Sequence, residues 1–172
     1  MLDLTAQDKK DIWAEALSKY PPISTADGLE TRCKMPSVLG TGYHDEIKLA
    51  PGLSLNIFEN TYQDVILRTP ENQHLVQVEI LLSGIIDSGD FLCQNAQRSY
   101  VGGSGIQPSF TSFYPKSQPI KGVNVHIEPQ LVGQFVAASD DGFETIQQLT
   151  HNQGQQQIFT QSITPAMQRV VR

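Results

Sequence analysis

The stretch from Val123 to Leu131 constrains the fold more than any other part of the chain. Apolar and polar residues alternate strictly from Val123 to Glu128, and this period of two predicts a β-strand with one buried face. The pair Glu128-Pro129 interrupts the alternation, and the apolar residues after it recur at helical spacing. We therefore predict that this is the last strand of a half-buried sheet, and that helices follow the sheet in sequence.

Length and charge exclude several functions. A chain of 172 residues forms one domain, or one domain with a helical appendage, and can bury a real core. It has 12 Lys and Arg against 18 Asp and Glu, and its only adjacent basic pair is Lys9-Lys10. Binding to nucleic acid or to an anionic membrane requires clustered positive charge. We therefore expect no membrane partner, and no contact between these residues and DNA.

The expected location is the cytoplasm. No apolar stretch approaches the roughly 20 residues that span a bilayer, and the N-terminus lacks the basic and apolar regions of a signal peptide. Cys33 and Cys93 fit no metal-binding or redox spacing, so two reduced thiols are favoured over a disulfide.

The N-terminus predicts an amphipathic helix. Thr5 is a suitable N-cap, acidic residues follow in the first turn, and Pro21-Pro22 ends the pattern. Its apolar stripe consists of Ile12, Trp13, Ala16 and Leu17. The favoured interpretation is a surface helix that Trp13 docks onto the core, and the alternative is an arm that covers a pocket.

Residues 43–128 are typical of a β-sandwich or barrel, because short alternating runs are separated by turns rich in Gly, Pro and Asp. After Pro129 we expect a first helix, a second over Phe143 to Leu149, and a third that opens at Thr164-Pro165. The stretch 151–157 is predicted as loop. The third helix is too short to be stable alone, so we expect the natural polypeptide to continue.

Nothing in the sequence assembles a catalytic set. The four histidines have neither His-x-His nor His-Glu-x-x-His spacing, and Gly-x-Ser-x-Gly is absent. Gly102–Gly105 is interpreted as a strand-breaking turn and not as a phosphate cradle. We therefore predict a binding protein that is not an enzyme and has no cofactor or metal.

The face on which polar strand residues lie is ambiguous. Asn124, His126 and Glu128 share one face of their strand. The favoured interpretation is a polar outer face over an apolar core. In a barrel wide enough to hold a ligand, polar residues can instead point inward. Glu79 and Asn56 carry the same ambiguity, and the second interpretation makes Asn56, Glu79 and His126 candidate ligand-binding residues.

Six phrases occur in an order and spacing that together resemble the N-terminal half of PchR-like regulators of the AraC family, especially their cyanobacterial branch. The resemblance runs from about residue 30 to the end of the chain. The phrases are Pro36-Ser37-Val38-Leu39-Gly40-Thr41-Gly42, Pro51-Gly52-Leu53, Leu82-Ser83-Gly84, Gly103-Ser104-Gly105-Ile106-Gln107-Pro108, Val125-His126-Ile127-Glu128-Pro129-Gln130-Leu131 and Thr164-Pro165-Ala166-Met167-Gln168.

The resemblance implies a mainly β fold with some α: a cupin-like β-barrel (double-stranded β-helix) preceded by an N-terminal helix and followed by C-terminal helices. Residues 1–128 would form the helix and sensory barrel, and residues 129–172 a dimerising and connecting segment. A small-molecule effector, of which an iron-siderophore complex is one kind, would bind in the barrel. DNA would be bound only through a C-terminal domain that these residues do not include.

Two sets of residues follow from this interpretation. Trp13 is the candidate that reports occupancy of the barrel, and the homodimer interface would use apolar residues of the first C-terminal helix, namely Leu131, Val132, Phe135 and Val136. Packing of some of these onto their own barrel is the alternative. Two other functions stay open, a metal-dependent cupin enzyme and a standalone small-molecule-binding module, although the cupin metal pattern is missing.

Overall fold

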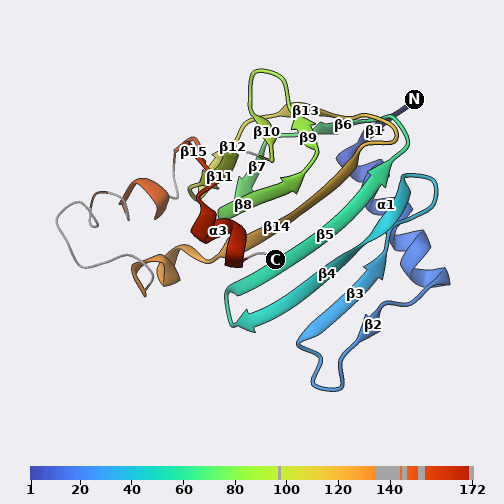
Figure 1. Ribbon diagram of the computed structural model, residues 1–172, viewed down its shortest axis with the longest axis horizontal. Coiled ribbons are helices and arrows are strands. Elements are labelled where there is room, and N and C mark those ends of the chain that lie inside the picture. Colours follow the sequence, from blue (N-terminus) through green and yellow to red (C-terminus); the bar gives the residue numbers. More distant parts are fainter. Residues whose placement is uncertain (97, 135–143, 145–146, 151–153, 171–172) are drawn as a thin grey trace.

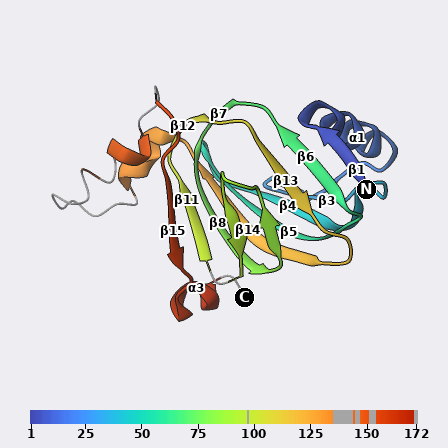
Figure 2. The same cartoon turned by 90° about the horizontal axis from the view of Figure 1, so that it is seen from above.

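The computed structural model describes residues 1–96, 98–134, 144, 147–150 and 154–170. Most of these residues form β-strands, and a large twisted sheet faces a smaller one (Figures 1 and 2). The prediction of a mainly β chain with an N-terminal helix is confirmed. In the described ranges, no helix has both the length and the apolar character needed to cross a membrane.

The large sheet has eight strands in the order β15-β11-β8-β14-β5-β4-β3-β2, and each neighbouring pair is antiparallel. Gly52 takes a φ of 78° in the turn between the long strands β4 and β5, a conformation that glycine adopts without steric cost. The strands are β2 Ile23–Ser24, β3 Glu30–Lys34, β4 Gly40–Ala50, β5 Leu53–Tyr62, β8 Val76–Ser83, β11 Arg98–Gly102, β14 Pro119–Ile127 and β15 Ile158–Ser162.

The small sheet has five strands in the order β1-β6-β13-β9-β10, and a separate two-stranded ribbon pairs β7 with β12. No strand pair of the described residues joins the two sheets, so they do not close into a barrel and the cupin-like barrel is not confirmed. Alternation identifies strands but carries no information about closure. The strands are β1 Leu2–Thr5, β6 Val65–Thr69, β7 Asn72–His74, β9 Ile85–Asp87, β10 Cys93–Asn95, β12 Gly105–Gln107 and β13 Phe110–Tyr114.

Helix α1 spans Ala6–Lys19 and begins at the predicted N-cap. The backbone N–H of Asp8 donates to Thr5 Oγ1 over 3.1 Å, and the N–H of Thr5 donates to the Asp8 carboxylate over 2.8 Å. This reciprocal pair is a capping box, which satisfies two N–H groups that a helix end otherwise leaves unpaired. No residue of α1 is fully buried, so the helix lies on the surface beside β1 and β6.

The C-terminal segment differs from its prediction. Pro129–Gln134 forms a 3-10 helix (η1), and α3 over Pro165–Val170 opens at Thr164, whose Oγ1 accepts from the N–H of Met167 over 3.2 Å. Between them β15 returns to the large sheet beside β11, so β14 is not the last strand and the segment is not wholly helical. Of the second helix, predicted over Phe143 to Leu149, Glu144 and residues 147–149 are helical, and the other residues lie outside the described ones.

One apolar cluster packs the C-terminal segment against the large sheet. Val76 of β8, Val132 of η1 and Leu149 are buried together, and Val101 and Ile127 pack against them. The segment therefore covers an apolar face of β8, β11 and β14 that would otherwise contact water.

Candidate functional site

A cavity of about 400 Å³ lies between the concave face of the large sheet and the small sheet. Strands β4, β5, β8 and β14 supply its floor, β9, β10 and β13 supply residues from the small sheet, and α1 reaches it through Lys9. Figure 2 looks along the space between the two sheets, with α1 at one end. A cavity of this size matches those that hold drug-sized ligands.

Strand register brings three of the four predicted ligand-binding residues together. Glu79 lies opposite Asn124 of β14, which lies opposite Asn56 of β5, and Gln77 lies opposite His126. All five side chains line the cavity. The favoured expectation of a solvated outer face is therefore wrong for Asn124, His126, Asn56 and Glu79. Glu128 does not line this cavity.

The reason lies on the opposite face of the same strands. Val76 alternates with Gln77 along β8, and its side chain is buried under η1 and Leu149. The apolar face is thus covered by residues distant in sequence, and the polar face lines the cavity. Alternation shows which residues share a face, but it does not show which face is covered.

Glu79 is a buried acid on the floor of the cavity. Its side chain is 9% exposed, and its Oε2 accepts hydrogen bonds from Asn124 Nδ2 over 2.8 Å and Gln77 Nε2 over 3.0 Å. Burial raises the pKa of Glu79 to about 7, although the hydrogen bonds from Gln77 and Gln94 oppose that shift. The cavity therefore holds a carboxyl group that changes its charge near neutral pH.

His126 lies beside Glu79 on the floor. Asn56 Nδ2 and His126 Nδ1 are 3.2 Å apart, and the imidazoles of His126 and His74 lie 5.6 Å apart, centroid to centroid. Burial lowers the pKa of His126, and His74 lowers it further. A neutral ring at this position can accept or donate a single hydrogen bond to a bound molecule.

His44 of β4 forms the end of the cavity nearest α1. Its Nε2 lies 2.9 Å from Asn60 Nδ2, and its ring stacks on Phe58 and meets the edge of Trp13 at 5.2 Å between centroids. Burial, followed by the charge of Lys9, lowers the pKa of His44 to about 4, so the ring is neutral at physiological pH. Trp13 does not line the cavity itself, but it contacts a side chain that does.

Gly122 keeps the middle of the floor open. A Cβ atom at Gly122 would lie 2.7 Å from the carbonyl oxygen of Ile80 and 2.8 Å from Cζ of Phe58. The absence of a side chain therefore lets the Phe58 ring lie over β14 and line the cavity.

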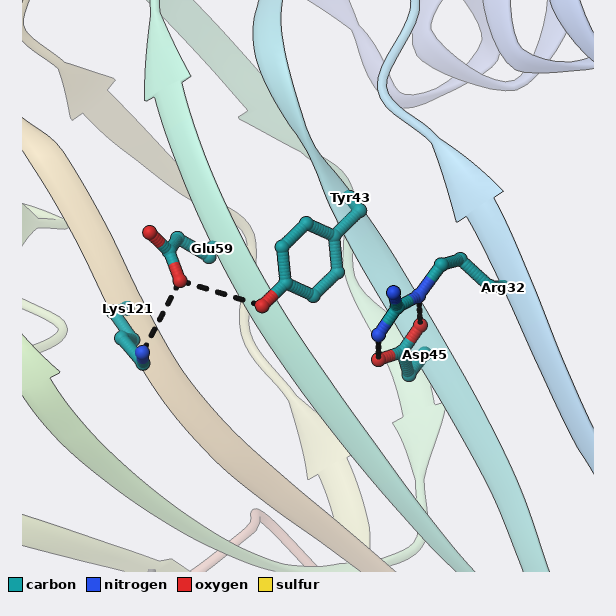
Figure 3. Close-up of polar contacts among 5 residues, drawn as sticks. All are labelled: Arg32, Tyr43, Asp45, Glu59 and Lys121. Atoms are coloured by element: carbon teal, nitrogen blue, oxygen red, sulfur yellow. Dashed lines mark hydrogen bonds and ion pairs between the residues drawn. The ribbon is translucent and has the colours of Figure 1, made fainter. Parts of the chain in front are cut away.

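The outer face of the same strands carries a polar ladder (Figure 3). Arg32 forms two 2.6 Å hydrogen bonds to the Asp45 carboxylate, and its guanidinium lies 4.5 Å from the ring centre of Tyr43. Glu59 accepts from the Tyr43 hydroxyl over 3.3 Å and pairs with Lys121 at 3.1 Å. This ladder ties β3, β4, β5 and β14 together on the side away from the cavity.

Sequence reasoning missed the aromatic and cationic part of the site. Tyr62 stacks on Tyr114 with 4.4 Å between centroids, and burial raises the pKa of Tyr114 to about 12. On sequence alone, His44 is a candidate only as a metal ligand, and Lys9 only forms part of a basic pair. The alternation that includes Ile47 does not extend back to His44, because His44, Asp45 and Glu46 are all polar.

The remaining predicted residues fall elsewhere. Val132 is 3% exposed and packs within its own chain, Leu131 keeps partial exposure, and Phe135 and Val136 lie outside the described residues. Within the described ranges, no group of three or more His, Cys, Asp and Glu side chains could hold a metal ion.

Together, the fold and its cavity define a β-sheet domain with a pocket that polar and aromatic side chains line. The family model of the regulatory protein PchR N-terminal domain matches residues 40–172, and the chain belongs to that family. It is therefore a regulatory domain of the kind found in transcription regulators. Neither the curated proteins nor the solved structures contain a match to it.

Proposed function

We propose that this chain is the effector-binding domain of an AraC-type transcription regulator, and that the effector binds in the cavity between the two sheets. The observation that carries the proposal is a ligand-sized cavity with a polar floor in a domain of a regulatory family. An iron-siderophore complex is one kind of effector that we propose, and DNA would be contacted by a separate domain of the regulator.

The proposed mechanism is a shift between two arrangements of α1 and the C-terminal segment. Both flank the cavity, because α1 reaches it through Lys9 and the C-terminal segment packs on the reverse side of β8. An effector that favours one arrangement by about 1–3 kcal/mol would be enough to change how the two DNA-binding domains are positioned.

A thermal-shift screen tests the proposal directly. The 172-residue protein is heated with iron-siderophore complexes, free siderophores and small aromatic compounds, and a true effector raises the melting temperature in a concentration-dependent way. The variant Gly122→Leu, whose side chain would meet Phe58 and Leu81, serves as a control that obstructs the cavity floor. A stabilising compound that acts equally on this variant binds elsewhere, and that result would contradict the proposed site.

Trp13 is the chain's single tryptophan, so its fluorescence reports on the contact with His44. We expect Trp13→Ala to weaken effector binding roughly tenfold, because an edge-to-face ring contact contributes about 0.5–1.5 kcal/mol beyond the area it buries. Trp13→Phe, which keeps an aromatic edge, should retain most of the affinity. Unchanged effector affinity and unchanged dimerisation in Trp13→Ala would remove this role.

We also propose a homodimer formed through the segment after Pro129. Because Val132 is used within its own chain, the contact would rely on Leu131 and on residues outside the described ranges. Sedimentation velocity at high protein concentration should give the mass of a dimer. A monomer throughout the concentration range counts against it.

A further inference from the structure

Lys9 is a cation inside the candidate site, and no residue in the described part of the chain pairs with it. Its side chain projects from α1 and lines both the main cavity and a small apolar space beside Leu39, Tyr62 and Tyr114. None of the ion pairs or hydrogen bonds of the described residues involves its ammonium group. This differs from Lys19 at the end of the same helix, which is exposed and pairs with Glu15.

The surroundings of Lys9 do not supply the missing negative charge. Burial lowers the pKa of Lys9, which reflects the cost of holding an ammonium group away from water. The neighbouring His44 ring is neutral and positive Lys9 disfavours its protonation. Asn60 Nδ2 lies 2.9 Å from His44 Nε2, and Asn60 Oδ1 is buried without a hydrogen-bond partner among the described residues. This end of the cavity thus holds an ammonium group that no carboxylate of the described residues pairs with.

The same surroundings restrict the kind of anion. Phe58, Tyr62 and Tyr114 line the cavity near Lys9, so a free inorganic ion would lose its water and gain a single cation in return. One unpaired ammonium balances one negative charge, which suits a carboxylate better than a doubly charged phosphate. An apolar or aromatic body attached to the anionic group would fill the rest of the cavity.

We infer that the cavity takes a singly charged organic anion, such as a carboxylic acid with an apolar body, and that Lys9 of α1 is its counter-ion. This inference rests on the proposed function, since it assigns a ligand class to the same cavity. Lys9 lies before residues 40–172, so its role is additional to what the family match covers. Binding of the anion would fix α1 over the cavity.

Two fluorescent probes that differ mainly by a charge test the inference. The first, 1-anilinonaphthalene-8-sulfonate, carries one negative charge, and the second, N-phenyl-1-naphthylamine, has the same rings without it. We expect the wild-type protein to bind the anionic probe more tightly, and Lys9→Met to weaken its binding roughly tenfold or more without changing that of the neutral probe. Lys10→Met removes a charge from the exposed neighbouring position and should change neither.

Each of the other outcomes contradicts one specific part of the inference. If the anionic probe binds wild type and Lys9→Met with equal affinity, Lys9 is not the counter-ion. Binding of the neutral probe in that case still supports the cavity as the ligand site. Failure of both probes to bind wild type overturns the proposed site as well. Displacement of the anionic probe by low-millimolar inorganic phosphate overturns the organic class.

Lys9→Arg guards against a purely steric explanation. It keeps the charge and should keep the preference for the anionic probe, so loss of that preference would overturn the charge argument. Circular dichroism and thermal melting check the fold of each variant. We expect Lys9→Met to melt no lower than wild type, because it removes a partly buried ammonium group that has no ion-pair partner among the described residues.

Discussion

Glu79→Gln should stabilise the folded domain by roughly 2–3 kcal/mol at pH 8 and by under about 0.5 kcal/mol at pH 4.5. Glu79 is 9% exposed, and burial raises the pKa of its carboxyl group to about 7. At pH 8 the wild-type protein must therefore hold a desolvated carboxylate on the cavity floor. Glutamine is uncharged, and its one side-chain oxygen can still accept from Asn124 and Gln77, so it removes the charge and keeps these two hydrogen bonds.

The direction of the pH effect follows from which state holds the proton more tightly. Between the ordinary pKa of 4.5 and the raised value of about 7, the folded state keeps the proton and the unfolded state releases it. Stability from this group is therefore fully present below pH 4.5, falls as the pH rises, and levels off above about pH 7. The advantage of Glu79→Gln should grow across the same interval.

Urea unfolding of wild type and Glu79→Gln at a series of pH values measures this difference. Glu71→Gln, at an exposed position, controls for the removal of one negative charge. A variant-to-wild-type difference that stays constant from pH 4.5 to pH 8 would show that Glu79 ionises normally in the folded protein.

Val132→Asp should cost the domain about 3 kcal/mol or more, because it places an unpaired carboxylate where an apolar side chain is buried. Val132 is 3% exposed and packs with Val76 and Leu149. The aspartate can reach water only if η1 and the helical residues around Leu149 leave the sheet. We therefore expect the C-terminal segment to detach before the large sheet unfolds.

Limited proteolysis and urea unfolding together report on this detachment. Gln134→Asp places the same residue on the exposed end of η1 and should change neither the cleavage rate nor the unfolding midpoint appreciably. If Val132→Asp is as resistant to protease as Gln134→Asp, the cluster does not hold the segment in place.

Local signals were enough to predict α1 and three long strands of the large sheet. Residues 53–57, 76–83 and 123–127 alternate, and each is part of a strand, while Thr5 and Asp8 form the predicted cap. These features depend on neighbours a few residues away. β15 was missed because Ile158–Ser162 is short, follows a Gln-rich stretch and becomes a strand only by pairing with β11.

The candidate site was predicted only in part for the same reason. Asn56, Glu79 and His126 were identified as polar strand residues, but their inward orientation depends on the distant C-terminal segment that covers the opposite face. Lys9 and Lys10 look alike in sequence, yet successive helix positions point in different directions and only Lys9 reaches the cavity. That distinction requires the position of the sheet under α1.

Strand β8 has a different neighbour on each side. The side chains of Gln77 and Glu79 line the cavity, whereas Val76 packs against η1 and Leu149 on the opposite face. A bound ligand that displaces the backbone of β8 must also change how η1 and Leu149 pack on its other face, because no other layer of the protein lies between them. The ligand pocket and the C-terminal segment are separated by the thickness of one β-strand.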